Sequence, residues 1–347
     1  MMQQLFDRSL FSVGGVTYTW KDVILFAMLS GRWRPLERAI REGLACVRRV
    51  EADDIEEPEE AVDAYAAEFR YARDLITAEE TEAWLEERGV ETSEWMDWVR
   101  REALRTLWAA ELPALVLRFP ADAAEVAEAA TADLLCSGKG EAFANGLAER
   151  VAATAALLEA GEELEVELPD GALERVLDHL PELDPEETEA TLLHLAVLDQ
   201  GLARFRELAA TPELIHRELE LGRLEWIRLD CRVIQFPTEA LAREAVLCVR
   251  EDGMGVDEVA ESAHAQVHEM RFYLGELDPD LQPRLLAALP QELIGPAPFE
   301  EQYALFLVLD KVLPDERAPA LRREIERRAV DRAVAEQVSR RVQWQAG

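Results

Sequence analysis

Apolar residues recur at intervals of three or four along most of the first 220 residues, and this is the spacing of amphipathic helices. Start signals support the pattern. Thr77-Ala78-Glu79-Glu80 has the form of a capping box, in which Thr77 accepts a hydrogen bond from the first turn and Glu80 reaches back. The spacing predicts helices at about 20–29, 35–50, 59–74, 78–88, 92–104, 121–135, 141–160, 171–180, 185–198 and 212–221.

Two short stretches of this region have a different pattern. Residues 10–20 are β-prone and carry Gly14-Gly15 in the middle, which predicts a small hairpin or an extended arm. Residues 164–168 predict a short extended piece between two helices.

The pattern changes near residue 225, where β-prone runs begin to alternate with helical ones. The predicted elements are a strand at 229–237, helices at 239–250 and 256–265, a strand at 270–275, a helix at 280–289, a turn or extended loop at 295–298 and a central strand at 303–308. A last helix at about 318–342 has an apolar stripe and many arginines. The C-terminal third therefore predicts a small α+β domain followed by a helix.

Length and charge limit the kinds of partner. The chain has 347 residues and is 49% hydrophobic, which is enough for a sizeable core and suits two modules. Its net charge of −34 repels phosphate backbones and anionic lipids, so we expect neither nucleic acid nor membrane as a partner. The simpler interpretation of this charge is that it keeps the protein soluble. The alternative interpretation is that it attracts basic peptides.

The cysteines and the start of the chain indicate a reducing compartment. Cys46, Cys136, Cys231 and Cys248 form no close Cys-x-x-Cys pair, so we expect reduced core thiols and neither a disulfide framework nor a metal site. We expect no cofactor. The first residues have no basic stretch followed by an apolar one, and no run is apolar enough to span a bilayer. The expected location is the cytoplasm.

Several short motifs in the C-terminal third resemble a parvulin-type prolyl isomerase. The order strand, helix, short helix, strand, helix, Gly-Pro loop, strand is the order of that family. The similar motifs are 238–245, which resembles the first parvulin helix, 256–260, Leu274-Gly275, the stretch 290–296 and the final strand 303–308.

The N-terminal region is similar to the helical modules of SurA/PpiC-type chaperones. The similar stretches are 11–23, an extended lead into helices, and 69–89, a helix pair. The resemblance covers roughly residues 1–100 and 228–347, and residues 105–220 resemble no family. It implies a mainly α protein with three parts. These are a SurA-like helical chaperone module at 1–220, a parvulin-like α+β domain with a four-stranded antiparallel sheet at 225–315, and a C-terminal helix at 316–347 packing back on the first module.

The catalytic positions of the family differ in this chain. Parvulins carry a histidine on the first strand and another on the last, whereas this chain has Cys231-Arg232 in the first region and Ala304-Leu305-Phe306 in the last. Twisting an X-Pro bond calls for a dry pocket and a well-placed polar group. Cys231 is the one polar match, so we expect little or no isomerase activity.

Large aromatic residues are the candidate peptide-binding groups. Phe272, Phe299 and Phe306 fit the lining of an apolar groove, and Trp84, Trp95 and Trp98 fit a second one on neighbouring helices. The alternative for both sets is a place in the core, because most large aromatics are buried.

Four functions remain open from the sequence. The first is a chaperone or maturation factor that holds an unfolded or precursor peptide or protein. The second is an active prolyl isomerase with a divergent site, and the third is a scaffold for one dedicated partner enzyme. The fourth is a metalloenzyme, for which His264 and His268, four residues apart, lack an evident third ligand.

Overall fold

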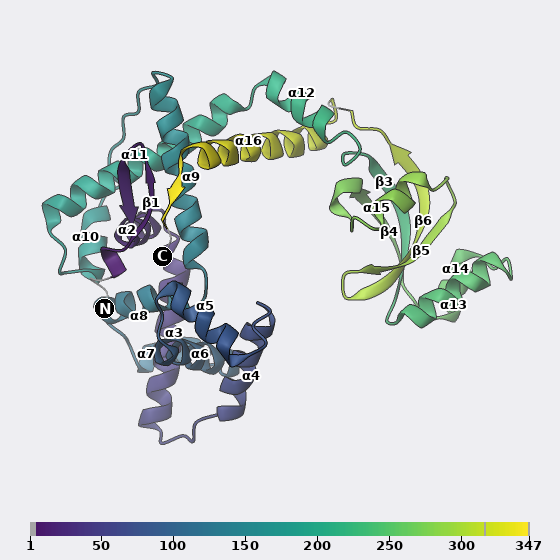
Figure 1. Cartoon of the computed structure of the whole chain (residues 1–347). Helices are drawn as coiled ribbons and strands as arrows, with labels where there is room; N and C mark the ends of the chain where they lie inside the picture. Colours follow the sequence, from purple (N-terminus) through teal and green to yellow (C-terminus); the bar gives the residue numbers. More distant parts are fainter. Residues whose placement is uncertain (1–4, 316, 346–347) are drawn as a thin grey trace. The chain divides into compact units, whose positions relative to one another are not determined.

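The computed structural model describes residues 5–315 and 317–345, and the chain divides into two compact units. Unit 1 holds the described residues up to Leu208 and those from Ala333 onward, and unit 2 holds Ala209–Arg332. Most of the chain is helical, and the strands form two small antiparallel sheets (Figure 1). The fold class is therefore mainly α with a small α+β part, as predicted.

Unit 1 is built from helices and one small three-stranded sheet. Its helices are α2 (Trp20–Leu29), α3 (Trp33–Ala52), α4 (Glu59–Tyr71), α5 (Ala78–Arg88), α6 (Thr92–Leu107), α7 (Leu112–Arg118), α8 (Ala123–Cys136), α9 (Gly140–Glu159), α10 (Ala172–His179) and α11 (Pro185–Ala209). Its strands are β1 (Ser9–Val13), β2 (Val16–Thr19) and β7 (Gln343–Trp344), in the order β2-β1-β7.

Local signals place several of these elements. Gly14 and Gly15 both have positive φ, and they form the two-residue turn between β1 and β2, so the predicted hairpin is confirmed. At the start of α5, the Glu80 N–H donates to Thr77 Oγ1 at 3.1 Å and the Thr77 N–H donates to Glu80 Oε2 at 2.8 Å. The predicted capping box is confirmed as well.

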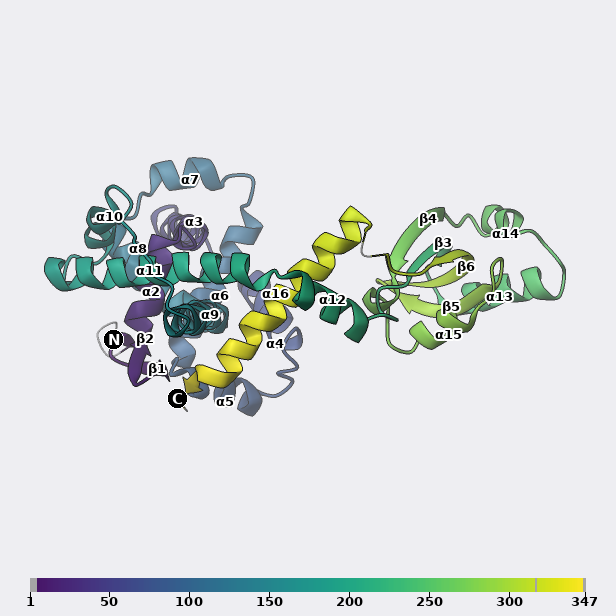
Figure 2. The ribbon, with the colours of Figure 1, turned by 90° about the horizontal axis from the view of Figure 1, so that it is seen from above.

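The helices of unit 1 pack closely where α11 crosses α9. Figure 2 looks along α9 and shows α11 running across it. Gly201 of α11 lies against Thr154 of α9, where an added Cβ would meet the Thr154 hydroxyl oxygen at 2.0 Å. The same hydroxyl donates to the Leu198 carbonyl at 3.3 Å. A glycine is needed at this crossing because the two backbones approach so closely.

Unit 2 is organised around a four-stranded sheet in which every neighbouring pair is antiparallel, as predicted. Its strands are β3 (Arg228–Phe236), β4 (Val267–Tyr273), β5 (Leu293–Phe299) and β6 (Gln302–Val312), in the order β4-β3-β6-β5. Its helices are α12 (Pro212–Leu221), α13 (Glu239–Arg250), α14 (Val256–Ser262), the 3₁₀ turn η1 (Leu274–Glu276), α15 (Gln282–Ala287) and most of α16 (Pro319–Arg341).

Each face of this sheet has its own core, because successive side chains on a strand point to opposite faces. On one face Ile234, Phe236 and Leu305 pack with α13 and α14. On the other face Cys231 and Phe306 pack with η1 and α15. We call this second face the α15 face.

The structure corrects two predictions and adds two elements. Residues 293–299 form the strand β5, where a turn or loop was expected. Pro296 and Pro298 are tolerated in it because β5 is an edge strand. β4 begins at Val267, earlier than expected, and α7 and β7 were not predicted.

The final helix α16 contributes to both units. Within unit 2, Leu321 and Ile325 pack with Ile215 and Leu219 of α12. Glu218 of α12 is 2% exposed and accepts a bond of 3.0 Å from Arg332 Nη2, which explains part of the arginine load of this helix.

Within unit 1, Val334 of α16 packs with Ala153 and Leu202, and Arg341 pairs with Glu159. None of the helices in the described part of the chain has the length and apolar character required to cross a membrane.

Candidate functional site

Three phenylalanines that the sequence singled out meet in unit 2. Phe272 comes from β4, Phe299 from β5 and Phe306 from β6. The ring centroids are 5.7 Å apart for Phe272 and Phe299, 5.5 Å for Phe299 and Phe306, and 6.2 Å for Phe272 and Phe306. All three pairs are edge-to-face, the arrangement that the aromatic quadrupole favours.

Strand alternation and a tight turn bring these rings together. Phe306 lies opposite Val233 of β3 and points to the α15 face. Phe299 lies opposite Gln302, beside the turn that joins β5 to β6, where Glu300 has a φ of 54°. Phe272 lies on the edge strand β4 and points to the same face.

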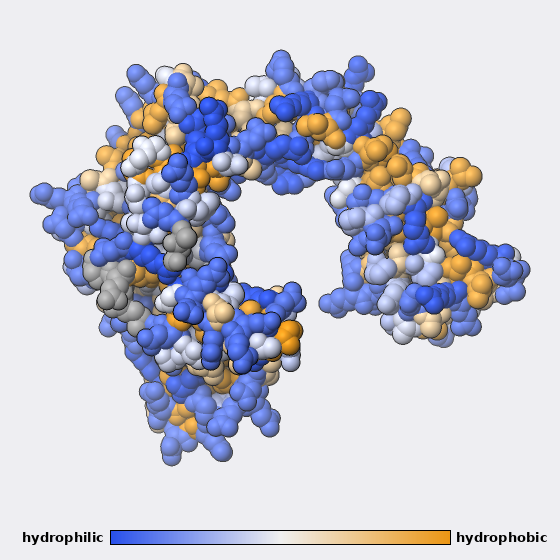
Figure 3. Space-filling view, viewed as in Figure 1, coloured by the Kyte–Doolittle hydropathy of each residue, from blue (hydrophilic) through white to orange (hydrophobic). Residues whose placement is uncertain are grey.

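The cluster is buried at its base and partly open at its rim. Phe306 is fully buried, whereas Phe272, Phe299 and Met270 are half-buried. We call the surface formed by Phe272, Phe299 and Met270 the aromatic surface. Figure 3 shows apolar residues reaching the surface of unit 2 among polar ones. The buried ring supports the two outer rings in fixed positions.

Cys231 lies beneath this surface, opposite Met270 and Val308 in the sheet. It is 1% exposed, and burial raises the pKa of its thiol to about 11. A thiol in this environment stays neutral near pH 7 and has no access to a substrate.

His268 is a polar group on this face that the sequence suggested only as a metal ligand. It lies on β4, opposite Val233 and two residues from Met270, and its side chain is exposed. Because alternate strand residues share a face, His268 points to the same side of the sheet as Met270 and Phe272. Neither β3 nor β6 carries a histidine.

The tryptophans of unit 1 are brought together by a residue that sequence reasoning missed. The ring of Phe69 in α4 lies 5.5 Å from Trp84, 5.7 Å from Trp95 and 5.0 Å from Trp98. Trp95 and Trp98 are buried, and Trp84 is half-buried with the Arg88 guanidinium 4.1 Å above its ring. This burial fits a core between α4, α5 and α6, and it leaves Trp84 as the most accessible of the three.

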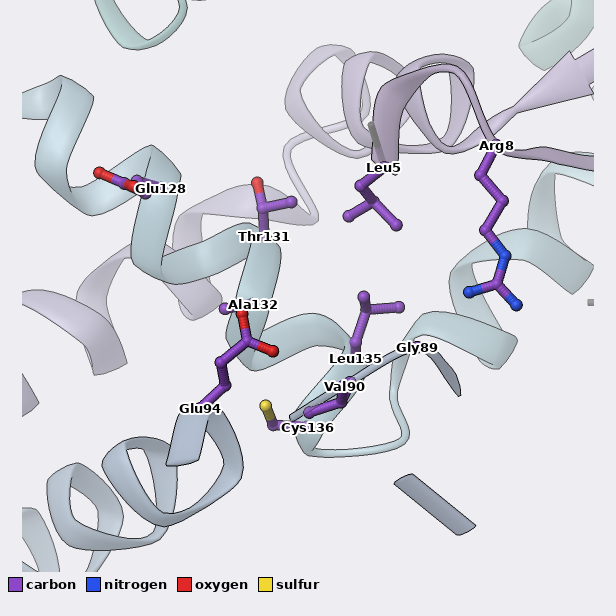
Figure 4. A pocket seen from close by; sticks show the side chains of 10 residues that line it. All are labelled: Leu5, Arg8, Gly89, Val90, Glu94, Glu128, Thr131, Ala132, Leu135 and Cys136. Carbon is purple, nitrogen blue, oxygen red and sulfur yellow. The ribbon is translucent and has the colours of Figure 1, made fainter. Parts of the chain in front are cut away.

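A pocket of about 220 Å³ lies nearby, where the end of α5 meets α6 and α8 (Figure 4). Leu5, Val90 and Leu135 point into it, and Glu94 lies on its rim. Arg8 borders the pocket and donates to the Arg88 carbonyl at 3.1 Å, which fixes its guanidinium at the end of α5. The walls are mostly apolar, and Glu94 already accepts a bond of 2.8 Å from the Glu91 N–H.

The histidine pair does not form a metal site with other side chains of the described region. His264 has a φ of 53° in the turn after α14, whereas His268 lies on β4, so the two do not share a helix face. Among residues 5–315 and 317–345, no group of three His, Cys, Asp or Glu side chains is placed to hold a metal ion.

No family model matches the chain. No curated protein matches it either. Among solved structures, the chain is similar to the crystal structure of PrsA from Bacillus subtilis, with 13% sequence identity and a TM-score of 0.21 over 60% of this chain and 86% of that one. A TM-score this low supports no conclusion about the fold or the function of this chain.

Proposed function

We propose that this protein is a chaperone-type protein or maturation factor that holds an unfolded or precursor peptide without catalysing prolyl isomerisation. The observation that carries the proposal is the aromatic surface of unit 2. Phe272 and Phe299 are half-buried and pack against a fully buried Phe306, so they form a supported apolar surface that is partly accessible. Large aromatics held in this way are the usual anchors of peptide side chains.

The rest of the sheet supports binding more than catalysis. Cys231 is buried and neutral, and β3 and β6 have no histidine. The net charge of −34 would keep a complex with an apolar client dispersed. Membership of the SurA/PpiC-type family and a cytoplasmic location stay predictions from the sequence.

A fluorescence anisotropy titration of a labelled, unfolded, uncharged apolar peptide tests the proposal. The double variant Phe272→Ala/Phe299→Ala removes both partly accessible rings, and we expect its Kd to rise roughly tenfold or more. The control is Leu241→Ala/Leu247→Ala, which removes two exposed leucines from α13 on the opposite face. Equal Kd values for the two variants, or no binding by the wild type at high micromolar concentration, would contradict the proposal.

A divergent prolyl isomerase is the second candidate, and one observation favours it. His268 is exposed on the face that carries Phe272. A protease-coupled assay on a short X-Pro peptide separates the two functions. Our proposal expects the rate of the uncatalysed reaction. Acceleration that His268→Ala abolishes would establish the isomerase in its place.

A scaffold for one partner enzyme is the third candidate, and co-purification tests it. One stoichiometric protein partner would favour a scaffold, whereas a mixture of clients would favour a general chaperone.

A further inference from the structure

An extended segment in unit 1 has the pattern of a strand without a partner strand. Residues 163–168 connect α9 to α10 and form no helix or strand. Side chains alternate along them. Leu164, Val166 and Leu168 are half-buried, whereas Glu163, Glu165 and Glu167 are exposed. We call residues 163–168 the acidic segment.

Both ends of the acidic segment are fixed. At one end the Glu162 N–H donates to the Leu157 carbonyl at 3.1 Å, and Arg204 Nε donates to the Glu162 carboxylate at 3.2 Å. At the other end the Pro169 carbonyl accepts a bond of 3.0 Å from the Ala172 N–H. Between these points, no backbone hydrogen bond joins the segment to another part of the described chain. Extended backbone in this state is free to pair with another strand.

A groove of about 310 Å³ runs beside the acidic segment. Pro169, which follows the acidic segment in the chain, helps to line this groove. Its apolar lining comes from Phe26 and Leu29 of α2, from Ala196 and Ala203 of α11, and from Val166 and Pro169. Its polar lining residues are Ser30, Glu167, Asp199 and Gln200. A side chain of a strand lying along the segment would reach this apolar lining.

The acidic segment itself is negative, whereas the Arg150 and Arg32 guanidiniums lie 4.6 Å and 5.9 Å from the Phe26 ring in the groove. No Lys or Arg occurs between Arg150 and Arg175 in the sequence. Asp199 at the groove is paired with Arg150 at 2.7 Å. In the described part of the chain, Glu163, Glu165 and Glu167 have no such ion pair, so their charges face solvent uncompensated.

We propose that the acidic segment binds an extended basic peptide by strand addition. In such a pair, side chains directly opposite each other on one face interact. Lys or Arg at alternate positions of the peptide would lie opposite the three glutamates. The apolar residues between them would lie toward the groove. The inference goes beyond the proposed function, because the acidic segment is in unit 1 and the aromatic surface is in unit 2.

A peptide of alternating Lys and Val, labelled with fluorescein and titrated with the full chain at low salt, is the probe. We expect Glu163→Gln/Glu165→Gln/Glu167→Gln to raise its Kd about tenfold. The control, Glu182→Gln/Glu186→Gln/Glu189→Gln, removes the same charge from exposed positions in unit 1, and we expect it to change the Kd less than threefold. Equal effects of the two triple variants would overturn the proposal, because the peptide would then sense only the overall charge.

A second peptide separates strand pairing from charge attraction. This peptide has the same sequence. The backbone nitrogens of alternate residues, those whose N–H groups would point toward the acidic segment, are methylated. We expect binding to fall at least tenfold, since methylation removes the donors of the ladder. Unchanged binding would overturn strand addition. Phe272→Ala/Phe299→Ala should bind the Lys-Val peptide like the wild type, so this proposal and the proposed function can fail separately, and loss of binding in that variant would overturn the placement in unit 1.

Discussion

Asp133 shows how burial and an ion pair act on one residue. Its side chain is 3% exposed in unit 1, and it accepts a hydrogen bond from Arg101 Nη2. Burial raises the pKa of the Asp133 carboxyl to about 6, and the opposing attraction to Arg101 is the smaller effect. The sequence could not predict this, because Asp133 stands in an Ala-rich helix and its partner lies 32 residues away.

The raised pKa predicts how stability depends on pH. An unfolded Asp titrates near 3.9, so between about pH 4 and pH 6 the native state holds more protons, and the contribution of this residue to the unfolding free energy falls as pH rises. Urea unfolding of wild type and Asp133→Asn measures this. The unfolding free energy of the wild type minus that of Asp133→Asn should fall by about 1 kcal/mol from pH 5 to pH 7.5. A constant difference, or a shift in the wild type's favour, would contradict the raised pKa.

The thiols give a second prediction for single residues. Cys46, Cys136 and Cys231 are buried and Cys248 is half-buried. Burial raises the pKa of Cys46 to about 11 and that of Cys136 to about 12. In the native protein at pH 8 we expect a thiol reagent to label Cys248 first. Cys248→Ser should abolish the fast phase, and fast labelling of Cys231 would argue for an accessible site there.

At the scale of elements, the sequence predicted most helices because their signals are local. Caps, periodicity and breaks lie within a few residues of the helix that they define. β5 was missed because Pro296 and Pro298 are typical of loops, and only its place at the sheet edge makes a strand possible. The partners of the tryptophans were missed for a related reason: Phe69 lies on another helix, so its contacts depend on packing.

The crossing of α9 and α11 predicts a costly substitution. Gly201→Ala would place a Cβ 2.9 Å from the Cβ of Thr154 and 2.0 Å from its hydroxyl, so the helices would have to move apart. We expect a loss of about 1–3 kcal/mol in urea unfolding. Gly255→Ala is the control, since an added Cβ there meets nothing within 4 Å and φ is not positive. Equal losses for the two variants would mean that the helices do not approach this closely.

The whole molecule is dominated by its charge and by pairings between distant segments. Figure 3 shows a largely polar surface, as the composition implies. The pairing of β3 with β6, which joins Phe236 to Tyr303, could not be deduced from either strand alone. The predicted order of strands and helices gave the best indication of this pairing. Likewise the sequence proposed an apolar role for the three phenylalanines, but only the fold brings their rings together.

The excess of negative charge predicts a stabilising effect of salt. Exposed ion pairs such as Arg327–Glu324 contribute little to stability, so screening them by salt costs little. The chain has 71 acidic and 37 basic residues, and screening the repulsion among the excess acidic residues favours the folded state. Between 20 mM and 500 mM NaCl we expect thermal unfolding to shift upward by about 2–4 °C. Sucrose at equal osmolality controls for water activity. A downward shift would mean that ion pairs outweigh repulsion.

Cross-linking with mass spectrometry tests the central claim, peptide binding at the aromatic surface, most directly. An unfolded, uncharged peptide with one benzophenone side chain is photolysed with the full chain, with and without excess unlabelled peptide. We predict that the cross-links removed by competition lie on β4 and at the β5–β6 turn, next to Phe272 and Phe299. Competed cross-links found only in unit 1, or none that compete, would contradict the account.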